Sequence, residues 1–339
     1  MQSLYMTAVG GPEVLALRSE PDPEPAAGEL IVEGAFTGVN FADVAARVGV
    51  YPGAPRPPIV LGFETSGRVL AIGQGVTRYR PGDRVVAVSR FGAQTDRLRV
   101  PEDHVVPLPN NVALETAAAV PVNYITAYHM LEHVGRLRPG GRVLVHMAAG
   151  GVGLAAIQLA RRIPGVEIFA TASASKLGVL ADAGVDHPID YRRLDYVAEV
   201  RRLTRNAGVD LVLDALGGRD WSRGYDLLAP CGQLVVFGWS NMVSNGRRTP
   251  WRLIRELARM PRFSPMRLMQ DNRGVAGVHL GYLWQRLDLL TGHLRILLAG
   301  VARGELVPRI HDVLPLREAA TAHRALQERR NVGKLLLAC

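Results

Sequence analysis

A glycine-rich segment in the middle of the chain has the residue types that hold a phosphate group. The apolar run at 143–147 reads as a strand, Ala148-Ala149-Gly150-Gly151-Val152-Gly153 follows it, and a helical pattern begins at Leu154. Gly150 lets the backbone approach a pyrophosphate, Gly153 lets the helix pack closely on the strand, and the helix N-terminus offers amide donors and partial positive charge. Because the motif lies between a strand and a helix, it predicts a dinucleotide site, with a purely structural turn as the alternative. The residues expected to line this site are Ala149, Gly150, Gly151, Val152 and Gly153.

The next strand ends without the carboxylate that binds the adenosine ribose in NADH-dependent enzymes. An acidic residue is expected there, about 20 residues after the glycines, but the chain has Thr171-Ala172-Ser173-Ala174-Ser175-Lys176. Hydroxyl groups and a compact ammonium favour a 2′-phosphate, so the segment predicts NADPH rather than NADH, with Ser173 and Lys176 at the phosphate. The alternative for Lys176 is a surface position on a helix. Tyr191 and Arg192, after the following strand, are secondary candidates for the same pocket.

Two kinds of scaffold must position these residues. Residues 1–110 read as short strands separated by glycine and proline, which indicates a compact antiparallel barrel. An alanine-rich helix is expected over 113–134, and from residue 142 apolar strands alternate with helices, which is typical of a doubly wound parallel sheet in an α/β fold. The last residues return to mixed elements, with a short strand at 306–310, and are expected to complete the barrel. We therefore predict one domain from residues 1–121 and 281–339 and a second from residues 122–280.

The composition is that of an ordinary globular protein with an excess of positive charge. Of 339 residues, 40 are basic and 31 acidic, giving a net charge of +9. No apolar run reaches the roughly 18 residues of a membrane span, and Met1 is not followed by a signal-like leader, so we expect a cytoplasmic protein. Cys231 and Cys339 are too few for a disulfide framework or a cysteine-rich zinc site. The basic residues are all arginine except Lys176 and Lys334; this charge favours an anionic partner or reflects codon bias, and the scarcity of aromatic residues argues against nucleic acid.

Several longer segments carry a family pattern. They are GVNFADVAARVGVYPG (38–53), PIVLGFETSGRV (58–69), GDRVVAV (82–88), VLVHMAAGGVGLAAIQLA (143–160) and VLDALGG (212–218). Together they resemble the zinc-free branch of the medium-chain dehydrogenase/reductases, the quinone oxidoreductase group. NRGVAGVHLGYL (272–283) and RNVGKLLL (330–337) are similar to the vesicle amine transport protein subfamily. The resemblance implies a Rossmann domain together with a β-rich, GroES-like barrel domain.

The resemblance also implies that no catalytic metal is bound. Zinc-containing relatives have cysteine and histidine ligands in the loop that here runs from Gly38 to Asp43, and Gly-His-Glu where this chain has Gly62-Phe63-Glu64. Without a Lewis acid, alcohol oxidation is disfavoured, and hydride transfer to an already polarised enone, enoyl thioester or quinone is implied. His129 and His133 are four residues apart on an expected helix, but they lack a nearby third ligand, so a structural pair is the favoured interpretation.

Reduction of an activated double bond needs a hydride, a donor for the enolate oxygen and a proton for the α-carbon. Because the GVYP turn resembles that of enoyl thioester reductases, Tyr51 is the expected proton donor, and packing on the nicotinamide is the alternative. Family position implies that Asn40 faces the nicotinamide, and that Asp43 orients its neighbours or caps the next helix. The cofactor contacts implied by motif position are Thr126, Phe237 and Gly238.

Residues 241–274 form the most basic segment. Four arginines recur at steps of three or four residues, and this spacing predicts an amphipathic helix. They are Arg248, Arg252, Arg255 and Arg259. A solvated face with a core or dimer contact, an electrostatic funnel for an acyl-CoA and a membrane-surface patch all remain open. Ser264-Pro265 predicts the start of a further helix, and the run 274–282 reads as an edge strand, so we expect a homodimer that pairs such edges.

The leading functional hypothesis is an NADPH-dependent reductase that delivers hydride to the β-carbon of an α,β-unsaturated acyl thioester. A short branched enoyl-CoA such as 3-methylcrotonyl-CoA is one such small-molecule substrate. A quinone or enone reductase is the first alternative. The second is an NADPH-binding scaffold or membrane-associated protein with little turnover.

Overall fold

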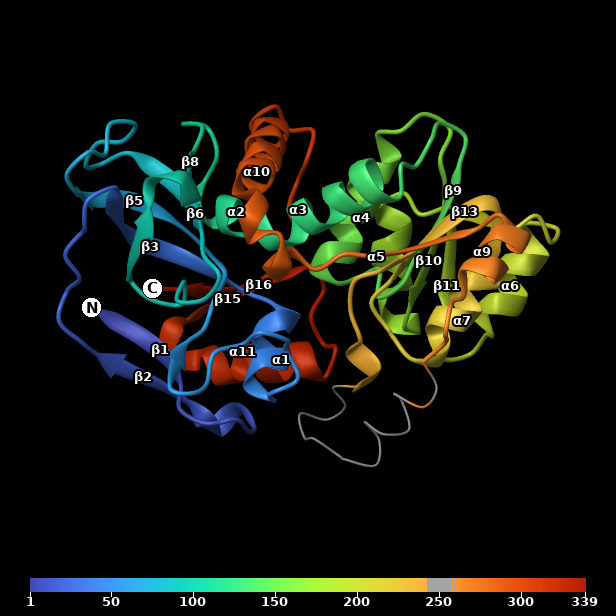
Figure 1. The fold of residues 1–339 in the computed structure, drawn as a ribbon, viewed down its shortest axis with the longest axis horizontal. Helices are drawn as coiled ribbons and strands as arrows, with labels where there is room; N and C mark the ends of the chain where they lie inside the picture. The colour runs from blue at the N-terminus through green and yellow to red at the C-terminus, as the bar shows by residue number, and fades with distance from the viewer. Residues whose placement is uncertain (243–257, 259) are drawn as a thin grey trace. The chain divides into compact units, whose positions relative to one another are not determined.

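The computed structural model describes residues 1–242, 258 and 260–339 (Figure 1). The arginines Arg248, Arg252, Arg255 and Arg259 lie outside the described residues. The chain divides into two compact units: the β unit, Met1–Ile125 with Leu280–Cys339, and the α/β unit, whose described residues are 126–242, 258 and 260–279. The division falls after Ile125 and before Leu280, against predicted boundaries after 121 and before 281.

A six-stranded parallel sheet forms the centre of the α/β unit. Its strands are β9 (Arg142–Val145), β10 (Glu167–Ala172), β11 (His187–Asp190), β12 (Val209–Asp214), β13 (Leu228–Val236) and β14 (Gly274–Gly277). They lie in the order β11-β10-β9-β12-β13-β14, with all neighbours parallel. The first strand along the chain, β9, is thus beside the fourth, β12, at the switch point where doubly wound sheets bind ligands. This confirms the predicted Rossmann fold and places β14 at a sheet edge.

Helices cover both faces of this sheet. After β9, the α-helices among the described residues of the unit are α4 (Gly151–Arg161), α5 (Leu177–Asp182), α6 (Tyr196–Leu203), α7 (Arg219–Tyr225) and α9 (Pro265–Asp271). Right-handed crossovers put α4 and α5 on one side and α6, α7 and α9 on the other (Figure 1). Phe169, Tyr196 and Tyr225 are the large buried side chains of the second side. As predicted, α9 begins at the Ser264-Pro265 pair, where the Ser264 hydroxyl accepts the Arg267 amide at 3.2 Å.

The β unit contains two sheets, which confirms a β-rich domain of the GroES-like kind. Its strands are β1 (Gln2–Met6), β2 (Leu15–Ser19), β3 (Glu29–Val39), β4 (Ile59–Val60), β5 (Glu64–Ile72), β6 (Arg84–Val88), β7 (Arg97–Pro101), β8 (Val105–Pro107), β15 (Ile310–Pro315) and β16 (Lys334–Ala338). The small sheet has the order β2-β1-β4, and the large one β15-β16-β3-β5-β6-β8, with β7 also paired to β3. The long strand β3 pairs with β7 through residues 29–33 and with β16 through residues 36–39. One strand therefore connects the N-terminal strands to the last strand of the chain.

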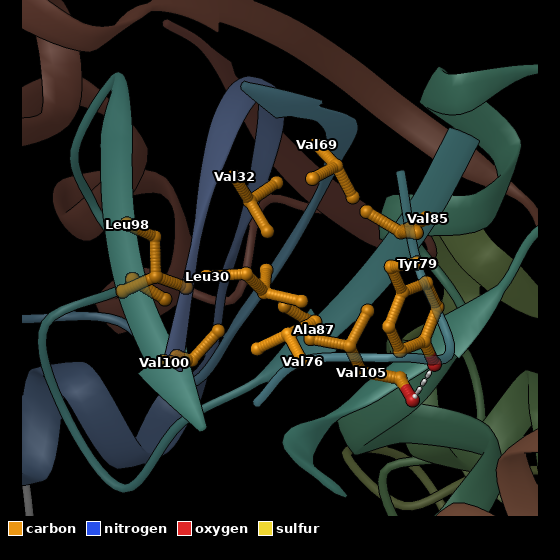
Figure 2. Packing of buried hydrophobic residues seen from close by; sticks show 11 residues of the cluster. Leu30, Val32, Val69, Val76, Tyr79, Val85, Ala87, Leu98, Val100 and Val105 are labelled. Carbon is orange, nitrogen blue, oxygen red and sulfur yellow. Dashed lines mark hydrogen bonds between the residues drawn. The ribbon is translucent and has the colours of Figure 1, made fainter. Parts of the chain in front are cut away.

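Valine and leucine side chains fill the interior of the large sheet. Leu30 and Val32 of β3 meet Val69 of β5 and Val85 of β6, all at most 2% exposed (Figure 2). The hydroxyl of the buried Tyr79 donates a hydrogen bond to the Val105 carbonyl at 2.5 Å, which Figure 2 marks by a dashed line.

Helices also belong to the β unit. Those among its described residues are α1 (Phe41–Arg47), α2 (Leu114–Ala118), α10 (Leu287–Ala302), α11 (Ala319–Gln327) and the start of α3 (Pro121–Tyr128).

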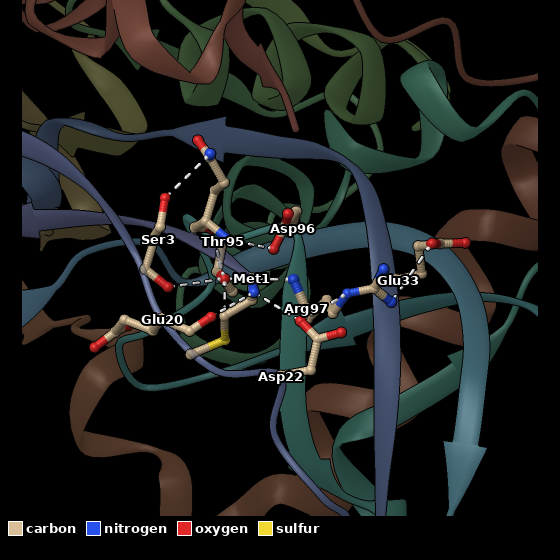
Figure 3. A network of polar contacts seen from close by, with 10 residues as sticks. Met1, Ser3, Glu20, Asp22, Glu33, Thr95, Asp96 and Arg97 are labelled. Atoms are coloured by element: carbon tan, nitrogen blue, oxygen red, sulfur yellow. Dashed lines mark hydrogen bonds and ion pairs between the residues drawn. The ribbon is translucent and has the colours of Figure 1, made fainter.

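A network of polar contacts outside the core links the N-terminus, just before β1, to β7. The amino group of Met1 contacts the Asp22 carboxylate at 2.6 Å, and Arg97 of β7 reaches both Asp22, at 3.2 Å, and Glu33, at 3.6 Å (Figure 3). Asp22 and Glu33 are mostly exposed. Because exposed ion pairs stabilise a fold weakly, each by less than about 1 kcal/mol, the buried strands rather than this network stabilise the unit.

Three elements differ from their predicted form. The edge strand expected over 274–282 is shorter, since β14 spans Gly274–Gly277 and Leu280–Tyr282 is a 3-10 helix. The expected single helix over 113–134 is divided: α2 ends at Ala118 and α3 begins at Pro121, because proline has no N–H to continue the preceding helix. Its last turn, His129–Val134, is a π-helix. The strand expected at 306–310 is instead β15, which begins at Ile310 beside Lys334 of β16; Pro308 lacks the N–H that a strand ladder requires.

Candidate active site

The glycine loop has the backbone that a pyrophosphate site needs. It follows β9, and α4 begins at Gly151, so the amides of its first turn have no acceptor within the helix. A Cβ on Gly153 would lie 2.5 Å from the Ala148 carbonyl oxygen, and one on Gly150 would lie 3.2 Å from that of Met147. Side chains at these positions would push the helix from the strand and fill the space over the loop. The predicted lining, residues 149–153, therefore fits a nucleotide diphosphate.

The residues predicted at the 2′-phosphate lie at the same edge of the sheet. Ser173 follows β10, and its hydroxyl is 3.4 Å from that of Ser175, while its carbonyl accepts the Lys176 amide at 2.9 Å. Tyr191 follows the neighbouring β11, and its amide donates to the Ala172 carbonyl at 3.3 Å. Arg192 extends over the Tyr191 ring. Because β10 and β11 are neighbours, these residues lie on adjacent loops, and their role at the 2′-phosphate stays a prediction.

The remaining cofactor candidates of the α/β unit lie on α3 and after β13. Thr126 is a buried residue of α3. The Phe237 amide donates to the Asp214 carbonyl at 3.0 Å, and a Cβ on Gly238 would lie 3.1 Å from the Ala215 carbonyl oxygen. The loops after β12 and β13 are therefore in close contact beside the switch point. The roles of Thr126, Phe237 and Gly238 in cofactor binding stay predictions.

Asp214 is a residue of this edge to which the sequence assigned no role. It ends β12, is fully buried, and accepts the amides of Leu216 at 2.6 Å and Gly217 at 3.2 Å. Burial raises its pKa, and the nearby His146, at the end of β9, opposes the rise. His146 in turn bonds the Thr171 hydroxyl at 2.9 Å. Asp214 therefore shapes the loop after β12, and the signal for it was its place in the VLDALGG segment.

In the β unit, Asn40 and Asp43 occupy the N-terminus of α1. One carboxylate oxygen of Asp43 accepts the Asn40 amide at 2.8 Å and the other accepts the Gly62 amide at 3.0 Å. Burial raises the pKa of Asp43 to about 7, against the opposite effect of these two hydrogen bonds. Both oxygens are engaged by backbone within a fully buried side chain, so the geometry favours the capping and orienting role over direct contact with a substrate.

Tyr51 lies in an aromatic cluster made by three loops. Its ring centroid is 5.8 Å from that of Phe63 and 6.1 Å from that of Phe91. Burial raises the pKa of the half-buried Tyr51, the Asp43 carboxylate adds to the rise, and Arg90 opposes it. The Arg90 guanidinium, on an exposed residue, lies 3.1 Å from where a Cβ on Gly53 would be. The hydroxyl of Tyr51 thus stays protonated at neutral pH, and a cation lies close to it.

Two further buried residues contact Asn40, and neither was predicted. Lys334, the first residue of β16, donates to the side-chain oxygen Oδ1 of Asn40 at 2.6 Å and forms an ion pair with Glu64. Glu64 accepts the Asn40 side-chain amide at 2.9 Å. The signals were present, since Lys334 is one of two lysines and Glu64 lies in the loop segment Gly62-Phe63-Glu64.

Possible metal ligands were compared by their positions in the described part of the chain. Within residues 1–242, 258 and 260–339, no three His, Cys, Asp or Glu side chains are placed to hold an ion. The His129 and His133 rings stack at 5.4 Å on the π-helical turn, where burial lowers the pKa of His129.

Comparison with known proteins assigns the chain to a family. Residues 26–110 match the alcohol dehydrogenase GroES-like domain and residues 183–337 match the zinc-binding dehydrogenase domain. The human synaptic vesicle membrane protein VAT-1 homolog is 42% identical over 339 residues, covering 99% of this chain and 86% of that protein. This chain belongs to the medium-chain dehydrogenase/reductase family, in its VAT-1-like quinone oxidoreductase group.

Solved structures of the family agree with the fold. Escherichia coli quinone oxidoreductase complexed with NADPH is 31% identical, with a TM-score of 0.88 over the full length of both chains. CurK enoyl reductase is 28% identical, with a TM-score of 0.84 over 99% of this chain and 98% of that one. The protein is therefore an oxidoreductase of this family. Among its described helices, none has both the length and the hydropathy to cross a bilayer.

Proposed function

We propose that this protein is an NADPH-dependent reductase of activated carbon–carbon double bonds, with an α,β-unsaturated acyl thioester as its substrate. The observation that carries the proposal is the environment of Tyr51. Its ring packs with those of Phe63 and Phe91, and its hydroxyl interacts electrostatically with the exposed Arg90. A neutral phenol can donate to an enolate oxygen or an α-carbon, and the nearby guanidinium stabilises the phenolate that remains.

Residues of this chain bind the cofactor and supply the proton. NADPH, when bound, supplies the hydride that reaches the β-carbon of the substrate. The amides of residues 151–153 bind the pyrophosphate, and Ser173 and Lys176 bind the 2′-phosphate. Tyr51 donates the proton that the α-carbon gains, so the product is the saturated thioester. Phe63 and Phe91 exclude water from the donor, which strengthens its hydrogen bond.

An acyl-CoA is the favoured form of the thioester because its nucleotide is anionic. The net charge of +9 raises the local concentration of anionic substrates, and Arg90 places a cation close to the proposed donor. A short branched enoyl-CoA such as 3-methylcrotonyl-CoA is the specific candidate. The similarity to CurK, an enoyl reductase, supports this substrate class.

Quinone or enone reduction is the second candidate. It is favoured by the likeness to E. coli quinone oxidoreductase, which extends over the full length of both chains. A scaffold with little turnover is the third, and the names of the VAT-1 relatives, which describe vesicle membrane proteins, are its support.

A panel of acceptors distinguishes these functions. NADPH oxidation is followed by absorbance with crotonyl-CoA, 3-methylcrotonyl-CoA, a free enone and a quinone. We expect the highest kcat/KM with a CoA thioester. Turnover of quinone alone would reject the thioester, and NADPH binding without turnover of any acceptor would favour the scaffold.

We also propose a homodimer located in the cytoplasm, with no nucleic-acid partner. The short strand β14 ends the parallel sheet of the α/β unit, and an open strand edge is protected when it pairs with a second copy. No metal takes part in the proposed reaction, because the acceptor is already polarised.

A further inference from the structure

A lysine and a glutamate are buried beside Asn40 in the β unit. Lys334 is 3% exposed and Glu64 is fully buried, and the ammonium and carboxylate are in direct contact. Burial of an ion pair removes both charges from water, so it stabilises a fold little compared with apolar packing. Fold stability alone therefore does not account for this pair, and an effect on neighbouring side chains is the alternative explanation.

The pair fixes the orientation of one carboxamide. The Asn40 oxygen Oδ1 accepts from Lys334 Nζ at 2.6 Å, and its nitrogen Nδ2 donates to Glu64 Oε1 at 2.9 Å. A lysine only donates and an ionised glutamate only accepts, so a flipped carboxamide would face donor with donor and acceptor with acceptor. Among the described residues, the second hydrogen on Nδ2 has no protein acceptor, and Asn40 is 5% exposed.

The same two residues are themselves fixed from other directions. The second carboxylate oxygen of Glu64 accepts the Val122 amide at 2.6 Å, in the first turn of α3. A Cβ on Gly38 would lie 2.1 Å from Glu64 Oε1 and 2.7 Å from Lys334 Cε. Only glycine at position 38 leaves room for the pair, so backbone and side chains together accommodate it.

We propose that Lys334 and Glu64 are positioning residues. They fix the orientation of the Asn40 carboxamide, so that the remaining N–H of its Nδ2 donates to the nicotinamide end of NADPH. This inference rests on the proposed NADPH-dependent function and on the family position of Asn40, which implies that Asn40 faces the nicotinamide. The pair acts through Asn40 and touches neither cofactor nor substrate. The pair ensures that Asn40 presents an N–H donor, and not its carboxamide oxygen, to the cofactor.

The test is a cycle of three variants: Asn40→Ala, the neutral double variant Lys334→Met/Glu64→Gln, and the triple variant. Dissociation constants are measured for NADPH, by its nicotinamide fluorescence, and for adenosine 2′,5′-bisphosphate, which has no nicotinamide. We expect Asn40→Ala and the double variant each to weaken NADPH about 10-fold, as for one good hydrogen bond. The bisphosphate is expected to bind within about twofold of the wild type, and the triple variant to bind NADPH no more weakly than Asn40→Ala.

The inference is overturned if the double variant binds NADPH as the wild type does, or if its loss adds in full to that of Asn40→Ala. Should the double variant fail to fold, Gly38→Ala replaces it, because a methyl group there displaces Glu64 without changing any charge. Wild-type NADPH binding by folded Gly38→Ala would equally overturn the inference. None of these readouts needs an acceptor, so a failure of the proposed reduction would be seen separately in the acceptor panel.

Discussion

Replacing Lys176 by alanine tests the choice of cofactor directly. Its backbone is held by the Ser173 carbonyl at 2.9 Å, and the Ser173 and Ser175 hydroxyls lie 3.4 Å apart. These residues directly follow β10, and the segment 173–176 contains no acidic residue. We therefore expect the variant to lose affinity for NADPH and to keep its affinity for NADH, which has no 2′-phosphate.

The size of the loss follows from the surroundings of the lysine. Two unit charges about 4 Å apart interact by about 1 kcal/mol in water and about 4 kcal/mol at the lower dielectric of a protein surface. Lys176 is half-buried, and Arg192 remains nearby, so we take about 1.5 kcal/mol, which is roughly a 10-fold increase in the Kd for NADPH. The Kd for NADH is expected to change by less than about twofold.

Binding is measured by nicotinamide fluorescence at two salt concentrations, since screening should reduce the difference between the cofactors. Arg138→Ala is the matched control. It removes one exposed positive charge that precedes β9, at the amino ends of the parallel strands, whereas Lys176 follows the carboxyl end of β10. Equal losses for NADPH and NADH, or an equal effect of Arg138→Ala, would refute the assignment and leave Lys176 a surface residue.

Three further changes test other parts of the molecule. Tyr51→Phe should lower kcat for thioester reduction at least about 10-fold, given the value of a general acid, and an unchanged kcat in the acceptor assay would remove Tyr51 from proton transfer. The pKa of Asp43 in the folded protein, about 7, lies above its ordinary value of 3.8. Its contribution to stability is therefore complete below about pH 4 and is lost, by up to about 4 kcal/mol, as the pH rises through 7. Urea unfolding should then show a larger advantage of the wild type over Asp43→Asn at pH 5 than at pH 8, and a difference independent of pH would contradict this. The Val278 amide donates to the Val236 carbonyl, so the preceding amide, of Gly277, points away from β13. Gly277→Pro should block pairing at that edge and yield monomers in sedimentation velocity, whereas a monomeric wild type or a dimeric variant would argue against the edge-paired dimer.

The fold was largely predictable because its signals are local. The short strands expected over residues 1–110 became the strands of the β unit, and the alternation of strands and helices after residue 142 gave the parallel sheet. The prediction failed where a neighbour in space decides the outcome. The strand expected at 306–310 begins only at Ile310, where β16 offers a partner, and Pro121 divides a helix that composition alone made continuous.

The candidate site divides in the same way. The glycine loop and Ser173 to Lys176 could be read from spacing, because each follows its strand directly. The surroundings of Asn40 could not, since Glu64 and Lys334 come from distant strands and no periodicity relates them. Tyr51 was chosen from a resemblance, while the aromatic rings around it emerge only when loops far apart in sequence meet.

The contact between Lys334 and Asn40 joins residues separated by 294 positions, and this has a consequence for biosynthesis. All six strands of the α/β unit, the last ending at Gly277, leave the ribosome before β16 does. Domains generally fold as units during synthesis, so a nascent chain can complete its parallel sheet while the loop at Asn40, made early, still lacks its lysine. The loop that is translated among the first is among the last to acquire its final hydrogen bonds.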